Sequence, residues 1–253
     1  MGLLRCFGGR EATATSYAAF DLIMIVKTGN ISYNTREIRI PGKKVLRRTL
    51  SDKRKAYFIL KRGLDLGFSM VVIAGVLSWL LPVMAILIKL DSRGPVLFLQ
   101  KRSGRGGRPF TCYKLRTMIV NVQADLCPAS ENDKRVTRLG KILRKSHLDE
   151  LPQFFNVLFG SMSLVGPRPY MLADCHKFSA MVPDYKIRNF VKPGITGLAQ
   201  VKGLHGTIAD FQTVFSRYQW DAFYVRHAGL MMDLRILRRT ITQFLTQKTP
   251  LCK

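Results

Sequence analysis

The longest apolar stretch of the chain runs from Leu66 to Ile88, where 23 consecutive residues carry no charge. As a helix this stretch would be roughly 35 Å long, which is enough to cross the hydrocarbon core of a bilayer. Lysines and arginines lie on both sides of it, and basic flanks favour the cytoplasmic side of a membrane. Within it, Pro82 removes a backbone donor and clashes with the carbonyl of Ser78, whose hydroxyl can bond a nearby carbonyl. These features favour a broken, re-entrant helix that enters and leaves one leaflet, with a spanning helix and a buried core helix as alternatives.

Shorter patterns after this stretch predict a β-hairpin and an amphipathic helix. Two strand-like runs, 96–100 and 109–115, are separated by a glycine-rich turn at 103–108. Near residues 136–146, apolar side chains recur at helical spacing and basic side chains occupy the other face. Such a helix either lies flat in a headgroup layer or faces a protein core with its basic face solvated. The apolar residues of that helix are Leu139, Ile142 and Leu143.

Charge narrows the range of partners. The chain has 41 Lys and Arg against 16 Asp and Glu, a formal net charge of +25, and yet 47% of its residues are hydrophobic. Disordered chains are polar and poor in aromatic residues, so this composition argues against disorder. The expected partner is anionic, which means nucleic acid, an acidic membrane surface or a phosphorylated substrate. The chain has five cysteines, an odd number, and no two of them are spaced as CxxC. Neither a disulfide framework nor a zinc knuckle is therefore indicated.

Two adjacent carboxylates, Asp149 and Glu150, are the first candidates for chemistry. Ser146 and Asp149 have the spacing of a capping box, and Pro152 suits a first helical turn, so the pair is predicted at a helix N-terminus. The helix dipole there favours an ionised carboxylate, which is the form that a carboxylate nucleophile needs. Two carboxylates also offer hard oxygen ligands to Mg²⁺. From these residues alone, plain helix capping is the simpler interpretation.

Candidate anion-binding residues follow from the basic side chains near this pair. Two prolines stiffen the backbone around Arg168, whose planar guanidinium can hold a phosphate through two hydrogen bonds. Glycines within residues 191–201 allow a tight loop with exposed N–H groups, which would form an anion nest. The candidates for phosphate or nucleotide binding are Arg168, Lys114, Arg116 and Arg144.

Seven motifs occur in the order found in one known family, and the chain resembles that family from about residue 61 to residue 240. It is the bacterial sugar transferase family, the monotopic polyprenyl-phosphate phosphosugar transferases that initiate exopolysaccharides. Each motif is modest alone, whereas seven in order are very specific. The motifs are Lys61-Arg62 with Asp65, the apolar stretch, Lys89–Pro95, Tyr113–Met118, Leu148–Gln153, Val165–Pro169 and Lys192–Gly197.

The resemblance implies a role for each matching position. The aspartate of the family attacks the β-phosphorus of a UDP-sugar, expels UMP and forms a covalent phosphosugar–aspartate, from which polyprenyl phosphate collects the phosphosugar. That aspartate matches Asp149, and the neighbouring Glu150 would help to hold Mg²⁺, the implied cofactor. Arg168, in the Pro-Arg-Pro motif, would be the phosphate clamp, and Lys61 and Arg62 would form the pair at the membrane interface.

The resemblance also implies an architecture, which is mainly α with a small β-hairpin (α+β). Residues 1–60 would be a basic N-terminal extension, poorly ordered or interfacial, and residues 61–90 the membrane-inserted, re-entrant helix. Residues 91–245 would form the cytoplasmic catalytic domain, with interfacial amphipathic helices. Many members break the membrane helix at an adjacent Ser-Pro pair. In this chain the break is expected at Ser78 and Pro82, which are not adjacent.

The implied substrates are a UDP-sugar, with UDP-glucose or UDP-galactose as our expectation, and undecaprenyl phosphate. The implied location is the cytoplasmic face of the bacterial inner membrane, with anionic lipids and downstream glycosyltransferases as partners and no nucleic acid. Two alternatives remain at this point. The net charge would also suit a membrane-tethered nucleic-acid-binding protein, although the sequence has no zinc finger or RNA-recognition signature. A non-catalytic scaffold of an envelope complex is the other.

Overall fold

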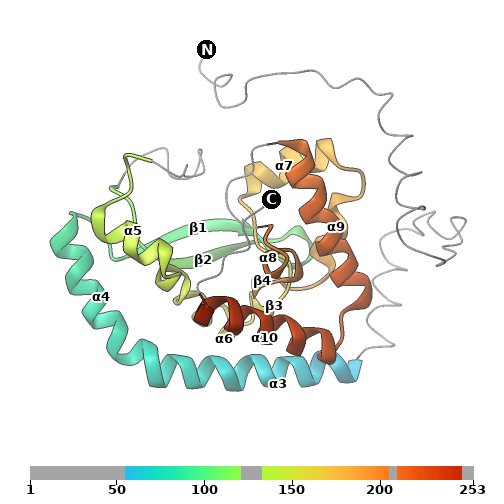
Figure 1. Cartoon of the computed structure of the whole chain (residues 1–253), viewed down its shortest axis with the longest axis horizontal. Coiled ribbons are helices and arrows are strands. Elements are labelled where there is room, and N and C mark those ends of the chain that lie inside the picture. Colours follow the sequence, from blue (N-terminus) through green and yellow to red (C-terminus); the bar gives the residue numbers. More distant parts are fainter. Residues whose placement is uncertain (1–54, 121–132, 205–209, 247–253) are drawn as a thin grey trace, which may run out of the picture. The chain divides into compact units, whose positions relative to one another are not determined.

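The computed structural model describes residues 55–120, 133–204 and 210–246, and this part of the chain is mostly helical with two small sheets (Figure 1). The predicted extension therefore lies almost entirely outside the described residues. Its last residues, Lys55 to Leu60, are already helical, so the predicted boundary at residue 60 falls inside a helix. The described elements are α3 (Lys55–Val72), α4 (Ser78–Asp91), β1 (Leu97–Ser103), β2 (Pro109–Leu115), α5 (Arg138–Lys145), α6 (Gln153–Leu158), β3 (Ser163–Val165), α7 (Leu172–Met181), β4 (Gly194–Thr196), α8 (Leu198–Val201), α9 (Phe211–His227) and α10 (Leu230–Thr246).

The apolar stretch forms one bent helix. Among the described residues, the helix Lys55–Asp91 is the one that is long and apolar enough to cross a membrane. Its two halves, α3 and α4, are joined by a turn of π-helix at Ile73–Leu77, and they run in clearly different directions (Figure 1). Such a turn interrupts the regular hydrogen-bond ladder and is a recognised cause of a helix bend.

The bend lies one turn before the proline. Pro82 lies inside the regular part of α4, so the helix does not break at the proline itself. The Ser78 hydroxyl donates to the carbonyl of Ala74 at 2.6 Å, and the Trp79 indole N–H donates to the carbonyl of Gly75 at 2.9 Å. These side-chain donors occupy carbonyls of the π-helical turn. The predicted bond from the Ser78 hydroxyl to a backbone carbonyl is therefore confirmed.

The first half of the bent helix is attached to the rest of the protein by buried polar contacts. Arg62 donates to the last carbonyls of α6, those of Val157 at 2.6 Å and Leu158 at 2.9 Å. Lys61 forms an ion pair of 2.7 Å with Asp233 of α10. Both side chains are therefore bound to protein and hold α3 against the domain. Their position at the membrane interface stays a prediction.

The second half of the bent helix is anchored to the same domain. Arg116, just after β2, donates to the carbonyls of Ser92 at 2.6 Å and Arg93 at 2.8 Å, which follow the end of α4. Ile88 is buried in a core cluster with Leu115 of β2 and Leu143 of α5. Both ends of the bent helix thus contact one folded body.

The predicted hairpin is confirmed. Strands β1 and β2 are antiparallel, with Gln100 opposite Cys112, and a single helical turn at Arg105–Gly107 joins them. In α5, which matches the predicted amphipathic helix, Leu143 is buried and Leu139 packs on the same cluster, so this face meets the core. Ile142 lies outside that face and is 64% exposed.

Three glycines allow two short strands to approach each other closely. Strands β3 and β4 are parallel, and a Cβ atom on Gly166, Gly194 or Gly197 would clash with backbone of the facing segment. The N–H of Gly194 donates to the carbonyl of Pro167 at 3.0 Å, and that of Gly166 to the carbonyl of Thr196 at 2.9 Å. The predicted anion nest is therefore wrong at Gly194, because its N–H group already donates to the carbonyl of Pro167 and is not available to an anion.

Candidate active site

The carboxylate pair lies in a single 3-10 turn, Leu148–Glu150, ahead of α6. The predicted capping box is wrong, because the Ser146 hydroxyl donates backwards to the carbonyls of Ile142 and Leu143 in α5. The chain then turns sharply at His147, which adopts a left-handed conformation with φ of 57°. Non-glycine residues adopt this conformation at an energetic cost, so the surrounding fold must hold the turn in place.

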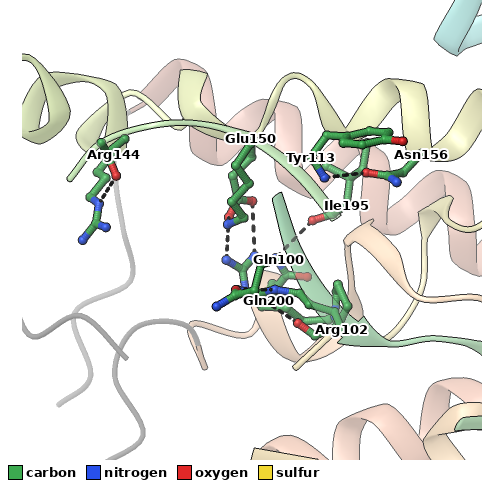
Figure 2. A network of polar contacts seen from close by, with 12 residues as sticks. Gln100, Arg102, Tyr113, Arg144, Glu150, Asn156, Ile195 and Gln200 are labelled. Carbon is green, nitrogen blue, oxygen red and sulfur yellow. Dashed lines mark hydrogen bonds and ion pairs between the residues drawn. The ribbon is translucent and has the colours of Figure 1, made fainter. Parts of the chain in front are cut away.

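Glu150 is paired with two cations. Its Oε1 atom lies 2.6 Å from Lys114 Nζ and 2.6 Å from Arg168 Nη2, while Oε2 accepts from Arg168 Nη1 at 3.2 Å. Burial alone would raise the pKa of Glu150, but Arg168 and then Lys114 outweigh burial and hold that pKa well below the usual value. The two cations thus favour the ionised form of Glu150. Its side chain points toward Gln100 of the hairpin (Figure 2).

Asp149 differs from its neighbour. It is only 9% exposed, and among the described residues no side chain or backbone group donates a hydrogen bond to its carboxylate. Burial raises its pKa above the usual aspartate value, and the positive charges of Lys114 and Arg144 counteract that rise. A carboxylate without donors keeps its lone pairs free for attack on an electrophile.

Arg144 lies on the Asp149 side of the pair. Its Nε atom donates to the Thr117 hydroxyl at 2.8 Å, and Figure 2 shows it set apart from Glu150. Burial lowers the pKa of Arg144, and the charge of Asp149 partly restores it. The structure therefore brings four predicted cation and carboxylate positions together with Arg168. These are Lys114, Arg144, Asp149 and Glu150.

Arg116 does not join this group. Besides its bonds to Ser92 and Arg93, its guanidinium donates to the carbonyl of Ile88 at 3.3 Å, and the residue is only 6% exposed. The prediction of Arg116 as a phosphate ligand is therefore corrected to a cap on the end of α4. Nothing in the sequence indicated that Arg116, which directly follows a strand, would bind the carbonyls at the end of α4.

Two arginines that the sequence analysis did not single out, one buried (Arg188) and one half-buried (Arg102), support the loop around Arg168. Arg188 donates to the carbonyl of Arg168, and Arg102 donates to the carbonyl of Pro169 at 2.6 Å. Arg188 also forms a buried ion pair of 2.9 Å with Asp221, and its guanidinium lies 4.4 Å from the Tyr170 ring centre. The carbonyls of Arg168 and Pro169 are thus each held by an arginine, and this backbone support orients the Arg168 side chain toward Glu150.

The donor set suits Mg²⁺ held jointly by protein and substrate. No cluster of three or more His, Cys, Asp or Glu side chains that could hold a metal occurs in the described part of the chain. Mg²⁺ is commonly bound by one or two carboxylates together with phosphate oxygens and water. Asp149, which accepts no hydrogen bond, and Glu150 Oε2, which accepts one, retain lone pairs for that purpose.

Comparison with known proteins identifies the class. Residues 56–247 match the family of bacterial sugar transferases. The chain is 44% identical over 191 residues to a UDP-N-acetylgalactosamine-undecaprenyl-phosphate N-acetylgalactosaminephosphotransferase of Aeromonas hydrophila, which covers 75% of this chain and 44% of the relative. It is 44% identical over 194 residues to a UDP-glucose:undecaprenyl-phosphate glucose-1-phosphate transferase of Caulobacter vibrioides, covering 76% of this chain and 72% of that protein. An exopolysaccharide production protein of Rhizobium leguminosarum is 42% identical over 198 residues, covering 75% of this chain and 96% of its own length.

The chain belongs to the bacterial sugar transferase family. It spans less than half the length of the Aeromonas relative and nearly all of the Rhizobium relative. The predicted family is therefore confirmed. The relatives act on different sugars according to their names, so the sugar does not follow from membership.

Proposed function

We propose that this chain transfers a hexose-1-phosphate from a UDP-sugar to undecaprenyl phosphate and releases UMP. The observation that carries the proposal is Asp149, a buried carboxylate without hydrogen-bond donors among the described residues, next to the fixed Lys114–Glu150–Arg168 cluster. Two relatives that are 44% identical to this chain are named as undecaprenyl-phosphate sugar phosphotransferases. UDP-glucose and UDP-galactose are the donors that we would test first.

The reaction proceeds in two displacements at one phosphorus. An oxygen of ionised Asp149 attacks the β-phosphorus of the UDP-sugar, and the bond from that phosphorus to the bridging oxygen breaks. UMP leaves with the bonding electrons, and the phosphosugar remains covalently bound to Asp149. A phosphate oxygen of undecaprenyl phosphate then attacks the same phosphorus, the bond to Asp149 breaks, and the free carboxylate is restored.

The residues around Asp149 favour this sequence. Arg168 and Lys114 place positive charge where the diphosphate must lie, and charge-assisted contacts from a guanidinium suit phosphate oxygens. Glu150 fixes both cations in position before substrate arrives. Mg²⁺, held by Asp149 or Glu150 together with the diphosphate, would neutralise charge on the departing nucleotide.

The way in which the bent helix is attached supports a re-entrant topology. Arg62 holds α3 to α6, and Arg116 holds the end of α4, so both ends contact the same domain. A helix crossing the bilayer would separate these ends by the full hydrocarbon thickness of about 30 Å. We infer that the domain lies on the cytoplasmic face of the inner membrane, where it meets UDP-sugar, anionic lipids and the downstream glycosyltransferases that extend an exopolysaccharide.

The covalent step is tested by trapping. The full chain is incubated with UDP-glucose or UDP-galactose labelled in the sugar, without undecaprenyl phosphate, and the adduct is mapped by intact mass and peptide sequencing. We expect one phosphosugar on Asp149 and none in Asp149→Asn, with lipid addition discharging the label. Label on another residue, or turnover kinetics that require both substrates bound together, would refute the mechanism.

The topology is tested separately by thiol labelling in intact cells and in opened membranes. Single cysteines at Lys55 and Lys101, introduced into a cysteine-free chain, should both be protected from an impermeable reagent in cells and both react once the membrane is opened. Opposite protection of the two positions would show a spanning helix.

A further inference from the structure

A groove with a volume of about 670 Å³ lies between α8, α9 and α10. None of the residues lining it belongs to the Asp149–Glu150 site, so it is a separate feature of the domain. Its floor and walls are largely apolar, and several of these side chains remain exposed, for example Met231 at 63% and Phe223 at 41%. The apolar lining includes Leu198, Val201, Trp220, Phe223, Met231 and Ile236.

The rim of the groove is basic. Four cations line it, and no acidic residue does; the cations are Lys202, Arg235, Arg238 and Arg239. The arginines of α10 are exposed and form no ion pair within the described part of the chain. Lys202 Nζ lies 4.6 Å from the centre of the Trp220 ring, so at this edge a cation stands directly over the apolar wall. An apolar groove with an unneutralised cationic rim is complementary to an anionic amphiphile.

Charge argues against two other occupants. The N-terminal 60 residues contain 12 Lys and Arg against 4 Asp and Glu, so that segment would bring more positive charge to a basic rim. A second copy of the chain carries a net charge of +25 and would be repelled in the same way. A lipid with a negative headgroup is attracted instead.

The position of α10 brings the groove close to lipid. Asp233, on the buried side of α10, pairs with Lys61 and accepts a hydrogen bond from Tyr57, so α10 lies against the membrane-inserted helix. Beyond the groove, α10 continues with exposed apolar side chains at Ile241 and Phe244. An apolar surface that continues along an interfacial helix allows an acyl chain to enter from the bilayer.

We propose that this groove binds one acyl chain of an anionic phospholipid, with the lipid phosphate on the rim arginines Arg235, Arg238 and Arg239. The inference rests on the membrane location proposed above, but its test measures lipid contact and not turnover. Failure of lipid binding and failure of sugar-phosphate transfer are therefore separate results.

Tryptophan fluorescence reports on the groove directly. The chain has two tryptophans, and Trp79→Phe leaves Trp220, in the groove wall, as the single reporter. The full-length variant is placed in phosphatidylcholine nanodiscs in two titrations. One adds phosphatidylglycerol and the other adds phosphatidylcholine, and in both the added lipid is brominated on its acyl chain, because bromine quenches indole fluorescence at short range. We expect half-maximal quenching at a roughly fivefold lower fraction of the anionic lipid, the factor that one basic residue near an anionic membrane supplies.

A charge-matched comparison separates the groove from general electrostatics. Replacing Arg235, Arg238 and Arg239 together by glutamine should abolish the preference for the anionic lipid. Replacing three exposed cations of α5 (Arg138, Lys141 and Lys145) by glutamine removes equal charge and should leave the preference intact. Equal quenching by both lipids, equal effects of the two triple variants, or a dimer that shields Trp220 from every lipid would overturn the proposal.

Discussion

The ion pair between Lys61 and Asp233 offers a quantitative test of how the bent helix is held against the domain. The two charges are 2.7 Å apart, and their side chains are only 12% and 6% exposed. Asp233 also accepts hydrogen bonds from the hydroxyls of Tyr57 and Tyr224, each at 2.8 Å. Removing one member of a buried pair leaves an uncompensated charge, which costs about 3–5 kcal/mol. Because the two tyrosines still solvate Asp233, we expect Lys61→Met to cost about 3 kcal/mol, at the low end of that range.

Thermal unfolding of the full chain in detergent, followed by far-ultraviolet circular dichroism, measures this effect. For a chain of this size a loss of 3 kcal/mol lowers the Tm by about 10 °C. Lys61→Met with Asp233→Leu removes both charges and should be less destabilising than Lys61→Met alone. Lys89→Met is the matched control, because Lys89 is exposed on α4 and forms no ion pair within the described residues. If Lys61→Met lowers the Tm no more than Lys89→Met, the contact does not anchor the helix.

Three other predictions concern the site and its support. Burial raises the pKa of Asp149, so adduct formation measured against pH should fail as pH drops through that raised value, and Asp149→Asn should stabilise the fold at pH 7 but not below the normal aspartate pKa. Arg188→Lys keeps the charge but loses the fork that fixes Arg168, so kcat should fall about 100-fold with little change in KM. A Cβ on Gly194 would clash with facing backbone, so Gly194→Ala should cost about 3 kcal/mol in thermal unfolding, whereas Gly67→Ala, with open space around it, should not destabilise.

The hairpin, the long apolar helix and the amphipathic helix α5 were predictable because their signals are local. Two strand-like runs around a glycine-rich turn predicted both strands. The observed β1 starts one residue later than the predicted run and continues to Ser103, whereas β2 has the predicted bounds. The uncharged stretch likewise predicted one long helix with an interruption. The position of that interruption differed, because donors on Ser78 and Trp79 act on the preceding turn while Pro82 is accommodated within the helix.

Partners of charged residues were not predictable in the same way. Sequence shows that Arg116 and Arg62 are cations, but both bind carbonyls of segments far from them along the chain. Arg188 gave no signal at all, because its role depends on the fold bringing it to the Arg168 loop. The sequence analysis found the Asp149–Glu150 pair but not the difference between its members. Burial and neighbouring cations decide that Glu150 is ion-paired and that Asp149 is not.

The arginine contacts at the two ends of the bent helix have a consequence for where the enzyme works. Arg62 and Arg116 fix both ends to the body that carries Asp149, so in the proposed topology the protein itself sets the depth of Asp149 relative to the acyl chains. A helix that returns to its starting leaflet has no contact with the opposite one. We therefore expect bilayer thickness to matter little to this protein, and the composition of a single leaflet to matter greatly.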